Sequence, residues 1–332
     1  MRVSIAMATC EGGRYLREQL DSLARQTRLP DELVISDDQS TDGTVDIARG
    51  FAAQAPFEVR IEVNPRRIGV TGNFDHALSL CTGDIVLLSD QDDVWFPSKV
   101  ETILDIARGS SAACWMVDAL LADASLVTTG ARKMEQIRAA RLPDSAMVMG
   151  CCAGFRRDLL DLLLPLPEDE PAHDTWMVQV AELLSLVERV EVPMQYYRRH
   201  GRNVSQASVN RVDRPRLGER LSGSIRRSFE RATNHAGLER EHQFYASAAA
   251  RLAERADQVR ALAGPGADAI VARTEGRRRL LERRMSIRGQ PIHRRAMRVM
   301  ELWRAGAYSE SGGLAGALKD ALLPTLHGAR RG

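Results

Sequence analysis

The first hundred residues alternate short apolar runs, rich in β-branched residues, with stretches of helical periodicity, and this alternation constrains the fold most strongly. Apolar runs bounded by polar turns are typical of strands; they occupy residues 3–8, 33–36, 59–63 and 85–88. Apolar residues recur at helical spacing between them, from Tyr15 to Leu23 and from Val45 to Phe51. Such units predict an α/β fold with a Rossmann-like, mostly parallel sheet flanked by helices.

The pattern continues less regularly as far as residue 200. We expect a helix from Pro97 to Arg108 and a strand at 112–117, whereas 128–145 has the composition of a loop and no clear period. That loop would be able to cover a site. Two more helices, at 158–164 and 174–186, and a strand at 190–197 are predicted to follow.

The amino-acid composition changes after Arg202. From Asp213 onward, stretches rich in Ala, Leu, Arg and Glu predict helices, interrupted at 264–266 and 289–291, and there is no strand signal. A chain of 332 residues suits one larger and one smaller domain. We therefore predict an α/β domain over residues 1–205 and a basic α-helical region over residues 206–332.

The net charge of +2 conceals a strong asymmetry. Residues 1–200 hold 20 Lys and Arg against 31 Asp and Glu, and residues 201–332 hold 26 against 13. A basic region beside an acidic domain suggests an anionic partner surface, which is lipid, nucleic acid or the acidic domain itself. Because the basic region has few aromatic residues and no recognised reading motif, we expect no nucleic-acid partner.

No secretion or membrane-spanning signal is present in the sequence. The N-terminus lacks a charged region followed by a cleavage site, and no run of about 18 apolar residues occurs. The cysteines are odd in number and lack CxxC spacing, which disfavours a disulfide framework or a zinc site; they are Cys10, Cys81, Cys114, Cys151 and Cys152. We expect a cytoplasmic protein with reduced cysteines.

The strongest local signal for chemistry is the acidic segment that follows the fourth predicted strand. Asp90, Asp92 and Asp93 place three carboxylates in four positions. Strand alternation would put Asp90 and Asp92 on one side, where oxygen ligands can hold Mg²⁺ or Mn²⁺ against a diphosphate. The alternative is a solvated acidic turn.

A second acidic segment follows the second predicted strand. Asp37 and Asp38 precede Gln39, Ser40 and a cap-like sequence. A carboxylate at this position can accept hydrogen bonds from a pyrimidine N–H or a ribose hydroxyl. A capped turn between strand and helix is an equally natural interpretation, and both can hold together.

These motifs, taken in order, resemble the bacterial inverting glycosyltransferases of family 2, which have the GT-A fold, and rhamnosyltransferases in particular. The resemblance covers roughly residues 1–205. The matching segments are Met7 to Gly12, Gln19 to Leu23 with Gln26 and Thr27, Ser36 to Thr44, Gly69 to Phe74, Asp90 to Trp95, His173 with Asp174 and Trp176, and Tyr197 to His200 with Asn203. The order and spacing of these segments carry the specificity.

The resemblance implies a role for each of these segments. It assigns Asp174 as the catalytic base, although a capping role at the start of a helix is the alternative. It assigns a divalent cation, Mn²⁺ or Mg²⁺, to Asp90, Asp92 and His200. The residues assigned to the nucleotide sugar are Thr9, Glu11, Asp37, Asp38, Arg67, Asn73, Asp90 and Gln91. The residues assigned to the acceptor side are Gly150, Cys151, His173 and Trp176.

The chain departs from the family pattern at three positions of the nucleotide loops. Cys10 and Glu11 stand where Tyr-Asn is frequent, and Gln39 stands where Gly is usual. Base stacking is therefore expected to differ. The expected activity is transfer of a sugar, with rhamnose as one candidate, from a dTDP- or UDP-sugar to a cell-surface glycan or lipid-linked acceptor of the O-antigen, capsule or exopolysaccharide type. The alternatives are nucleotidyl transfer and a non-catalytic protein that binds anionic surfaces or nucleic acid.

The basic region contains two clusters of arginine. One lies among apolar residues at 292–304, and the other comprises Arg277 to Arg279 with Arg283 and Arg284. Helices of this composition can lie on an anionic membrane, which predicts peripheral contact with the inner face of the plasma membrane. The alternative is a solvated face of a helical subdomain that packs on the α/β domain.

Overall fold

The computed structural model of the chain describes residues 1–168, 172–201, 235–288, 290–308 and 313–322. The chain divides into two compact units, one formed by residues 1–216 with 257–265 and the other by 217–256 with 266–332. The predicted domain boundary at residue 205, and Asn203 of the family pattern, fall outside the described residues. The boundary therefore stays a prediction.

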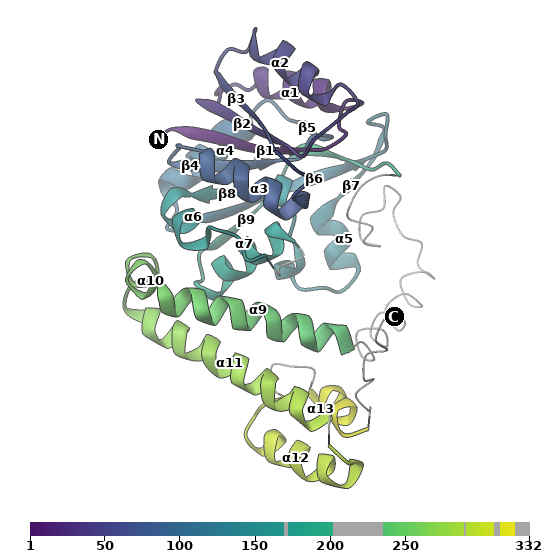
Figure 1. Cartoon of the computed structure of the whole chain (residues 1–332), viewed down its shortest axis with the longest axis vertical. Coiled ribbons are helices and arrows are strands. Elements are labelled where there is room, and N and C mark those ends of the chain that lie inside the picture. The colour runs from purple at the N-terminus through teal and green to yellow at the C-terminus, as the bar shows by residue number, and fades with distance from the viewer. Residues whose placement is uncertain (169–171, 202–234, 289, 309–312, 323–332) are drawn as a thin grey trace. The chain divides into compact units, whose positions relative to one another are not determined.

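The first unit is built on a nine-stranded sheet flanked by helices (Figure 1). Its strands are ordered β3-β2-β1-β4-β8-β6-β9-β5, and β7 pairs with β6. The four parallel strands that the sequence predicts form one half, namely β1 (Val3–Thr9), β2 (Glu32–Asp37), β3 (Glu58–Val63) and β4 (Ile85–Ser89). The predicted α/β class with a parallel-dominated sheet is confirmed.

The other half of the sheet mixes strand directions. Antiparallel β8 (Ala153–Arg156) lies between β4 and β6 (Cys114–Ala122), and β6 pairs in parallel with β9 (Val187–Arg198). The two-residue β5 (Val94–Trp95) pairs antiparallel with β9. Because β5 directly follows the acidic segment, this pairing brings the end of β9 beside residues 90–93.

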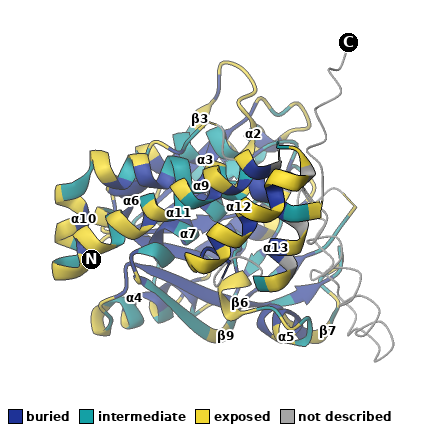
Figure 2. Ribbon diagram, turned by 90° about the horizontal axis from the view of Figure 1, so that it is seen from below, coloured by how far each residue is buried: buried dark blue, intermediate teal, exposed yellow. Residues whose placement is uncertain are grey.

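Helices flank the sheet and bury its apolar strands. They are α1 (Leu16–Ala24), α2 (Thr44–Ala52), α3 (Gly69–Leu80), α4 (Lys99–Gly109), α5 (Lys133–Ala139), α6 (Arg157–Leu163) and α7 (His173–Leu183). Every residue of β2 and β4 is buried, and dark blue, buried segments lie among the helices of Figure 2. Strands covered on both faces read as continuous apolar runs, which explains why the sequence identified them.

The prediction of a loop over residues 128–145 is wrong. This segment forms the edge strand β7 (Thr128–Arg132), then α5 and a 3-10 turn (Asp144–Ala146). Strand β7 is polar and largely exposed, so it has no apolar face to bury. Its hydrogen-bonded pairing with β6 stabilises it instead. The helix predicted at 174–186 ends earlier, at Leu183, and the following strand starts at Val187.

The described part of the second unit is helical, as predicted. Its helices are α9 (His235–Glu254), α11 (Ala267–Arg288), α12 (Ile292–Arg304) and α13 (Gly313–Leu322), while α10 (Ala256–Ala263) falls almost entirely in the first unit. Residues of α11, α12, α13 and the turn after α12 share a small core, formed by Ile287, Val299, Leu302, Ala307, Tyr308 and Ala317. No described helix has both the length and the apolar character needed to cross a bilayer.

Candidate active site

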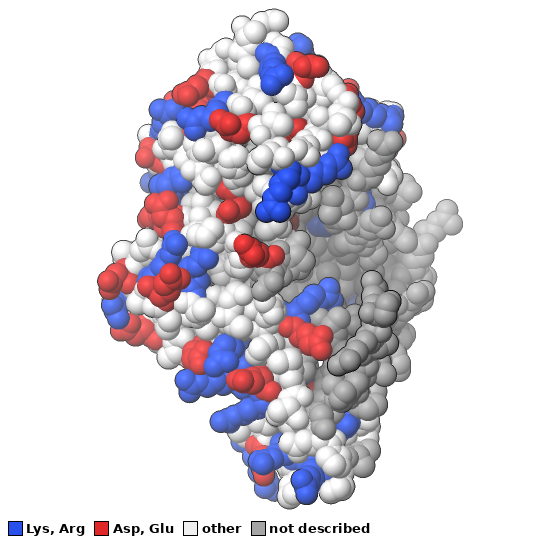
Figure 3. Space-filling view, in the orientation of Figure 1, with Lys and Arg blue, Asp and Glu red and all other residues white. Residues whose placement is uncertain are grey.

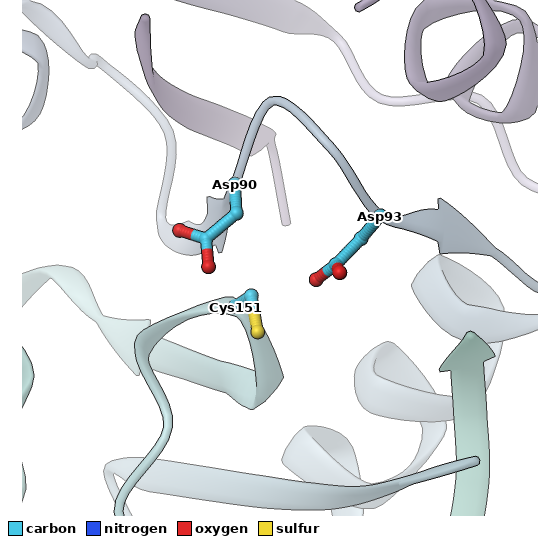
Figure 4. Close-up of side chains that lie close together, drawn as sticks. All are labelled: Asp90, Asp93 and Cys151. Carbon is cyan, nitrogen blue, oxygen red and sulfur yellow. The ribbon is translucent and has the colours of Figure 1, made fainter. Parts of the chain in front are cut away.

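The acidic segment forms a turn between β4 and β5, so strand alternation does not apply to it. An oxygen of Asp90, an oxygen of Asp93 and the Sγ atom of Cys151 lie within 4.8 Å of one another, and Figure 4 shows both carboxylates directed toward the cysteine. Asp93 is fully buried and accepts hydrogen bonds from Gln195 Nε2 at 2.6 Å and Arg198 N at 3.1 Å. The expectation that alternation aligns Asp90 with Asp92 is wrong because residues 90–93 are not extended.

Negative charge accumulates in this turn, and the charge of Lys99 only partly offsets its effect on Asp90. The pKa of Asp90 is raised to about 7, first by burial and then by the negative charges of Asp92 and Asp174. The pKa of Asp93 is also held well above its usual value, by burial first and then by Asp92 and Asp90. Mutual repulsion between these neighbouring carboxylates would be relieved by a bound cation.

The end of β9 places His200 against the acidic turn. His200 Nε2 lies 2.7 Å from Asp92 Oδ2, and both side chains are largely shielded from solvent. The imidazole ring stacks on the ring of Tyr15, with ring centroids 4.9 Å apart. The guanidinium of Arg198 also lies over the Tyr15 ring, 4.5 Å from its centroid. The structure therefore brings together Asp92 and His200, two of the three residues assigned to the cation. The third, Asp90, lies two residues before Asp92 in the sequence.

The residues around the turn fit a divalent cation. Asp90 and Asp92 supply carboxylate oxygens, which Mg²⁺ and Mn²⁺ accept, and the imidazole of His200 adds a nitrogen that suits a transition metal. Cys151 is a poor ligand for a hard cation, because a hydrogen bond with Cys152, and burial, hold the pKa of its thiol well above the usual value. The carboxylates and the imidazole are therefore the candidate ligands.

Asp174 lies in the first turn of α7 and faces the same region. Its Oδ2 accepts a hydrogen bond from Gly150 N at 3.1 Å, and its Oδ1 accepts one from Thr175 N at 2.7 Å. Since Gly150 precedes Cys151, the loop before β8 connects Asp174 to the acidic turn. The N-cap residue of α7 is Ala172, so Asp174 accepts from one backbone N–H of the first turn, that of Thr175, without occupying the cap position.

The acceptor-side assignments have different outcomes. His173 is buried and stacks on Phe74 with ring centroids 4.0 Å apart, and a Cβ added at Gly150 would lie 2.7 Å from His173 Nε2. Trp176 is fully buried and donates from Nε1 to Leu163 O at 3.2 Å. The assignment of Trp176 to the acceptor surface is therefore wrong, because the indole belongs to the core.

Cys151 likewise does not present its side chain to an acceptor. It is 1% exposed, and its backbone oxygen accepts a hydrogen bond from Lys99 Nζ at 2.7 Å. The segment Gly150–Cys152, a 3-10 turn, therefore acts through its backbone, by holding Asp174 on one side and receiving Lys99 on the other.

The acidic pair after β2 organises the nucleotide-side loops. Asp37 Oδ2 accepts from Thr9 Oγ1 at 2.7 Å, and Asp37 Oδ1 accepts from Ser40 N at 2.8 Å. Asp38 accepts from the N–H groups of Ile68 and Gly69 at 2.7 and 2.9 Å, at the beginning of α3. Both carboxylates are buried and order this turn, whereas the N-cap of the helix that follows β2 is Gly43, which makes no side-chain cap.

Glu11 and Arg67 lie nearer the surface and form an ion pair with a 2.6 Å contact between Arg67 Nη2 and Glu11 Oε1. Glu11 has a positive φ of 49° and also accepts hydrogen bonds from Thr41. Cys10 beside it is the only one of the five cysteines, all within the described residues, that is not buried. These partly exposed groups form the accessible edge of the predicted nucleotide site.

Asn73 and Gln91 are already engaged by the protein. Asn73 is buried and donates to Thr9 O at 3.0 Å, and it accepts from Asn64 Nδ2 at 2.8 Å. The amide of Gln91 accepts from Cys10 N at 2.9 Å and donates to Cys10 O at 3.0 Å. Both side chains thus position the loop after β1 rather than offer unpaired groups to a ligand.

Comparisons with known proteins relate the first part of this chain to a family. The family model described as glycosyl transferase family 2 matches residues 4–164. The protein carries a family 2 glycosyltransferase domain. It is accordingly a glycosyltransferase that uses a nucleotide-sugar donor, which favours sugar transfer over the nucleotidyl-transfer and non-catalytic alternatives.

Individual relatives support the same assignment. An uncharacterized glycosyltransferase of Nostoc sp. is 24% identical over 257 residues, which cover 74% of each chain. The dTDP-rhamnosyl transferase RfbG of Shigella flexneri is 33% identical over 113 residues, which cover 33% of this chain and 39% of that protein. The crystal structure of S. aureus TarS residues 1–349 with UDP-GlcNAc has a similar fold, with a TM-score of 0.55 at 17% identity and 92% coverage of both chains.

Four residues around the turn were not assigned from the sequence, although the structure connects them to it. They are Asp93, Lys99, Gln195 and Arg198, all buried polar or charged side chains. Arg198 Nε donates to Asp92 O at 2.7 Å, which fixes the backbone of the turn. Asp93 had a local signal, as the third carboxylate of the acidic segment, and Arg198 lies in the matching segment Tyr197 to His200. Lys99 and Gln195 had none, because their contacts are made between distant strands and helices.

Proposed function

We propose that the protein is an inverting glycosyltransferase in which Asp174 is the catalytic base and Asp90, Asp92 and His200 hold a divalent cation. The observation that carries this proposal is the convergence of Asp174 and the acidic turn. The loop Gly150–Cys152 holds Asp174 through Gly150 N, and the Sγ atom of Cys151 lies within 4.8 Å of carboxylate oxygens of Asp90 and Asp93. Three acidic side chains drawn together from separate elements suit a base beside a cation site.

The proposed reaction is a single displacement at the anomeric carbon of the donor sugar. Asp174 takes the proton of the acceptor hydroxyl, and the hydroxyl oxygen forms the new glycosidic bond on the face opposite the diphosphate. The bond between the anomeric carbon and the diphosphate oxygen breaks, and the nucleotide diphosphate leaves with that electron pair. A bound cation would neutralise charge on the leaving diphosphate. Fixed by Gly150 N and Thr175 N, the base keeps its orientation toward the acceptor.

For the donor we propose a dTDP- or UDP-sugar, with rhamnose as the transferred sugar. The sequence similarity to a dTDP-rhamnosyl transferase over 113 residues supports this choice. Glu11 and Arg67 would line the edge of the nucleotide site, and the buried Thr9, Asp37 and Asp38 would hold its loops in place. The proposed acceptor is a cell-surface glycan, carried on a lipid where the pathway is membrane-bound.

We propose further that residues 1–205 are the catalytic domain and that 206–332 form an accessory helical domain. The predicted basic cluster of α11 is largely neutralised within its own unit. Ion pairs join Arg277 to Glu241 and Arg278 to Glu275, and the buried Arg284 pairs with Asp320 at 2.7 Å. Blue and red side chains accordingly lie next to each other over these helices in Figure 3.

Helix α12 retains an amphipathic surface that suits an anionic bilayer. Met297, Met300 and Trp303 are 62%, 52% and 46% exposed, and α12 and α13 carry many of the yellow residues in Figure 2. Arg294 and Arg304 are exposed nearby and make no ion pair within the part of the chain that the structure describes. Apolar side chains flanked by cations are typical of interfacial helices.

Vesicle co-sedimentation tests this membrane contact. The wild-type protein should bind phosphatidylglycerol vesicles at low salt, and the double variant Arg294→Glu/Arg304→Glu should not. The matched control, Arg25→Glu/Arg49→Glu, changes the net charge equally on exposed positions of the first unit and should bind as the wild type does. If all three proteins bind the vesicles equally, or if none of them binds, the proposed membrane contact is refuted.

A thermal-shift panel tests the proposed function. UDP, dTDP and GDP sugars are each added with and without Mn²⁺, because a ligand that binds only the native state raises the melting temperature. A metal-dependent shift with dTDP- or UDP-sugars, lost in Asp92→Asn, is the expected result. No shift with any nucleotide sugar, in the presence of Mn²⁺, contradicts the proposal.

A further inference from the structure

Lys99 is a completely buried lysine at the first position of α4. Its Nζ donates to Cys151 O at 2.7 Å and to Gln195 Oε1 at 2.6 Å, and it lies 3.6 Å from the centroid of the Trp95 ring. A buried ammonium group is costly unless partners replace its water. Two hydrogen bonds and an aromatic face provide that replacement here.

One of these contacts leads to the acidic turn. Gln195 is fully buried on β9, and its Nε2 donates to Asp93 Oδ2 at 2.6 Å. Asp93 directly follows Asp92 and is held from its other side by Arg198 N at 3.1 Å. The Gln195 amide therefore transmits the position of the Lys99 ammonium group to the turn that carries the proposed cation ligands.

The other contact leads to the proposed base. Cys151 O, which accepts from Lys99 Nζ, belongs to the residue that follows Gly150, and Gly150 N donates to Asp174 Oδ2 at 3.1 Å. The loop is short and buried, so a shift of the Cys151 carbonyl moves the Gly150 N–H as well. Lys99 thus lies between the two halves of the site and donates a hydrogen bond to one supporting group of each half, Cys151 O and Gln195 Oε1.

We infer that Lys99 is a positioning residue, which sets the spacing between the base Asp174 and the acidic turn by bonding to Cys151 O and Gln195 Oε1 together. The inference rests on the proposed function, since it assumes that base and cation act in one displacement. Lys99 is completely buried, so its ammonium group is not presented to a substrate. Its loss should therefore slow the chemical step more than it weakens nucleotide binding, because positioning acts on the transition-state geometry.

The test compares Lys99→Met with Arg157→Met. Methionine keeps an apolar side chain against Trp95 and removes the charge. Arg157 is a matched control, because it donates to the backbone carbonyls of Gly83 and Cys81 at the opposite end of β4 from the acidic turn. Both variants should lose melting temperature. Only Lys99→Met should lower kcat, by at least about tenfold, while the Mn²⁺-dependent nucleotide Kd changes by less than about threefold.

Other outcomes overturn the inference. If kcat per folded molecule is unchanged in Lys99→Met, or if nucleotide affinity falls as much as kcat, Lys99 supports the fold or the whole site instead. Should Lys99→Met fail to fold, Gln195→Met cuts the same connection on the side of the turn, and normal turnover in that variant would refute the idea. In the double variant the two losses in kcat should not add, because both act through one connection.

The wild-type enzyme and Asp174→Asn separate this inference from the proposed function. If the wild type transfers no sugar, the proposed function fails. If the wild type is active, Asp174→Asn is inactive and Lys99→Met is normal, only the positioning role of Lys99 fails.

Discussion

A methyl group added at Gly150 would test how tightly the loop before β8 holds the proposed base. The new Cβ would lie 2.7 Å from His173 Nε2 and 3.4 Å from Asp174 Cβ, whereas ordinary contact begins at 3.4 Å. The imidazole ring is buried and stacked on Phe74, so it has little freedom to rotate away. Relief therefore requires a movement of roughly 0.7 Å shared by His173 and the loop.

Such a movement would displace the Gly150 N–H that holds Asp174. Overpacking of this kind costs about 1–3 kcal/mol of stability, and a misplacement of about 1 Å at a reacting group can cost about 100-fold in rate. We expect Gly150→Ala to lower kcat by about 10- to 100-fold. Measured with the donor found in the thermal-shift panel, the nucleotide Kd should change little, because the acidic turn keeps its own contacts.

Gly50→Ala is the matched control. Gly50 lies exposed on α2, and nothing lies within 4 Å of an added Cβ. Alanine is a better helix former, so the variant should gain about 0.5–1 kcal/mol of stability and keep its kcat. If kcat in Gly150→Ala stays within about twofold of the wild type, the loop does not position Asp174 as described.

Three further predictions concern the cation, the nucleotide loops and the helical unit. Burial, Asp92 and Asp174 raise the pKa of Asp90 to about 7 in the metal-free protein, so Mn²⁺ must displace a proton below that pH; its apparent affinity, measured by calorimetry, should rise by up to about tenfold per pH unit below 7 and level off above it. Cys10 should be the cysteine that a maleimide labels first in the native protein, and nucleotide sugar with Mn²⁺ should slow that labelling, as mass spectrometry of the modified peptide would detect. Asp320→Ala should destabilise the second unit by about 3–5 kcal/mol in urea unfolding, because it leaves a buried arginine unpaired. A flat pH dependence, unprotected Cys10 or unchanged unfolding would contradict each in turn.

The sequence predicts those parts of the fold that local pattern determines. The buried parallel strands were recognisable because strands covered on both faces must be continuously apolar. Helix α3 has no such signal, since its glycines and polar residues give a weak apolar face, and contacts with β1 and β2 support it. Strand β8 is four residues long, and nothing in those residues indicates that it inserts antiparallel between β4 and β6.

The candidate site divides in the same way. The motifs name Asp90, Asp92, Asp174 and His200, and the fold places His200 beside Asp92 and Asp174 near the turn, while their roles stay predictions. The sequence could not predict which side chains of a motif are exposed. Trp176 lies in the core although it belongs to the same motif as Asp174. The supporting contacts of Lys99 depend on the pairing of β5 with β9, which no local pattern specifies.

The most direct test of the account compares nucleotide binding and sugar transfer in Asp174→Asn and Asp92→Asn, both measured with the donor and cation that stabilise the wild type. We predict that Asp174→Asn binds the nucleotide with Mn²⁺ as the wild type does and transfers no sugar, since only the proton acceptor is lost. Asp92→Asn should lose both properties, because the cation site is impaired. Near-normal transfer by Asp174→Asn, or unchanged metal-dependent binding by Asp92→Asn, would contradict the assignment of base and cation site.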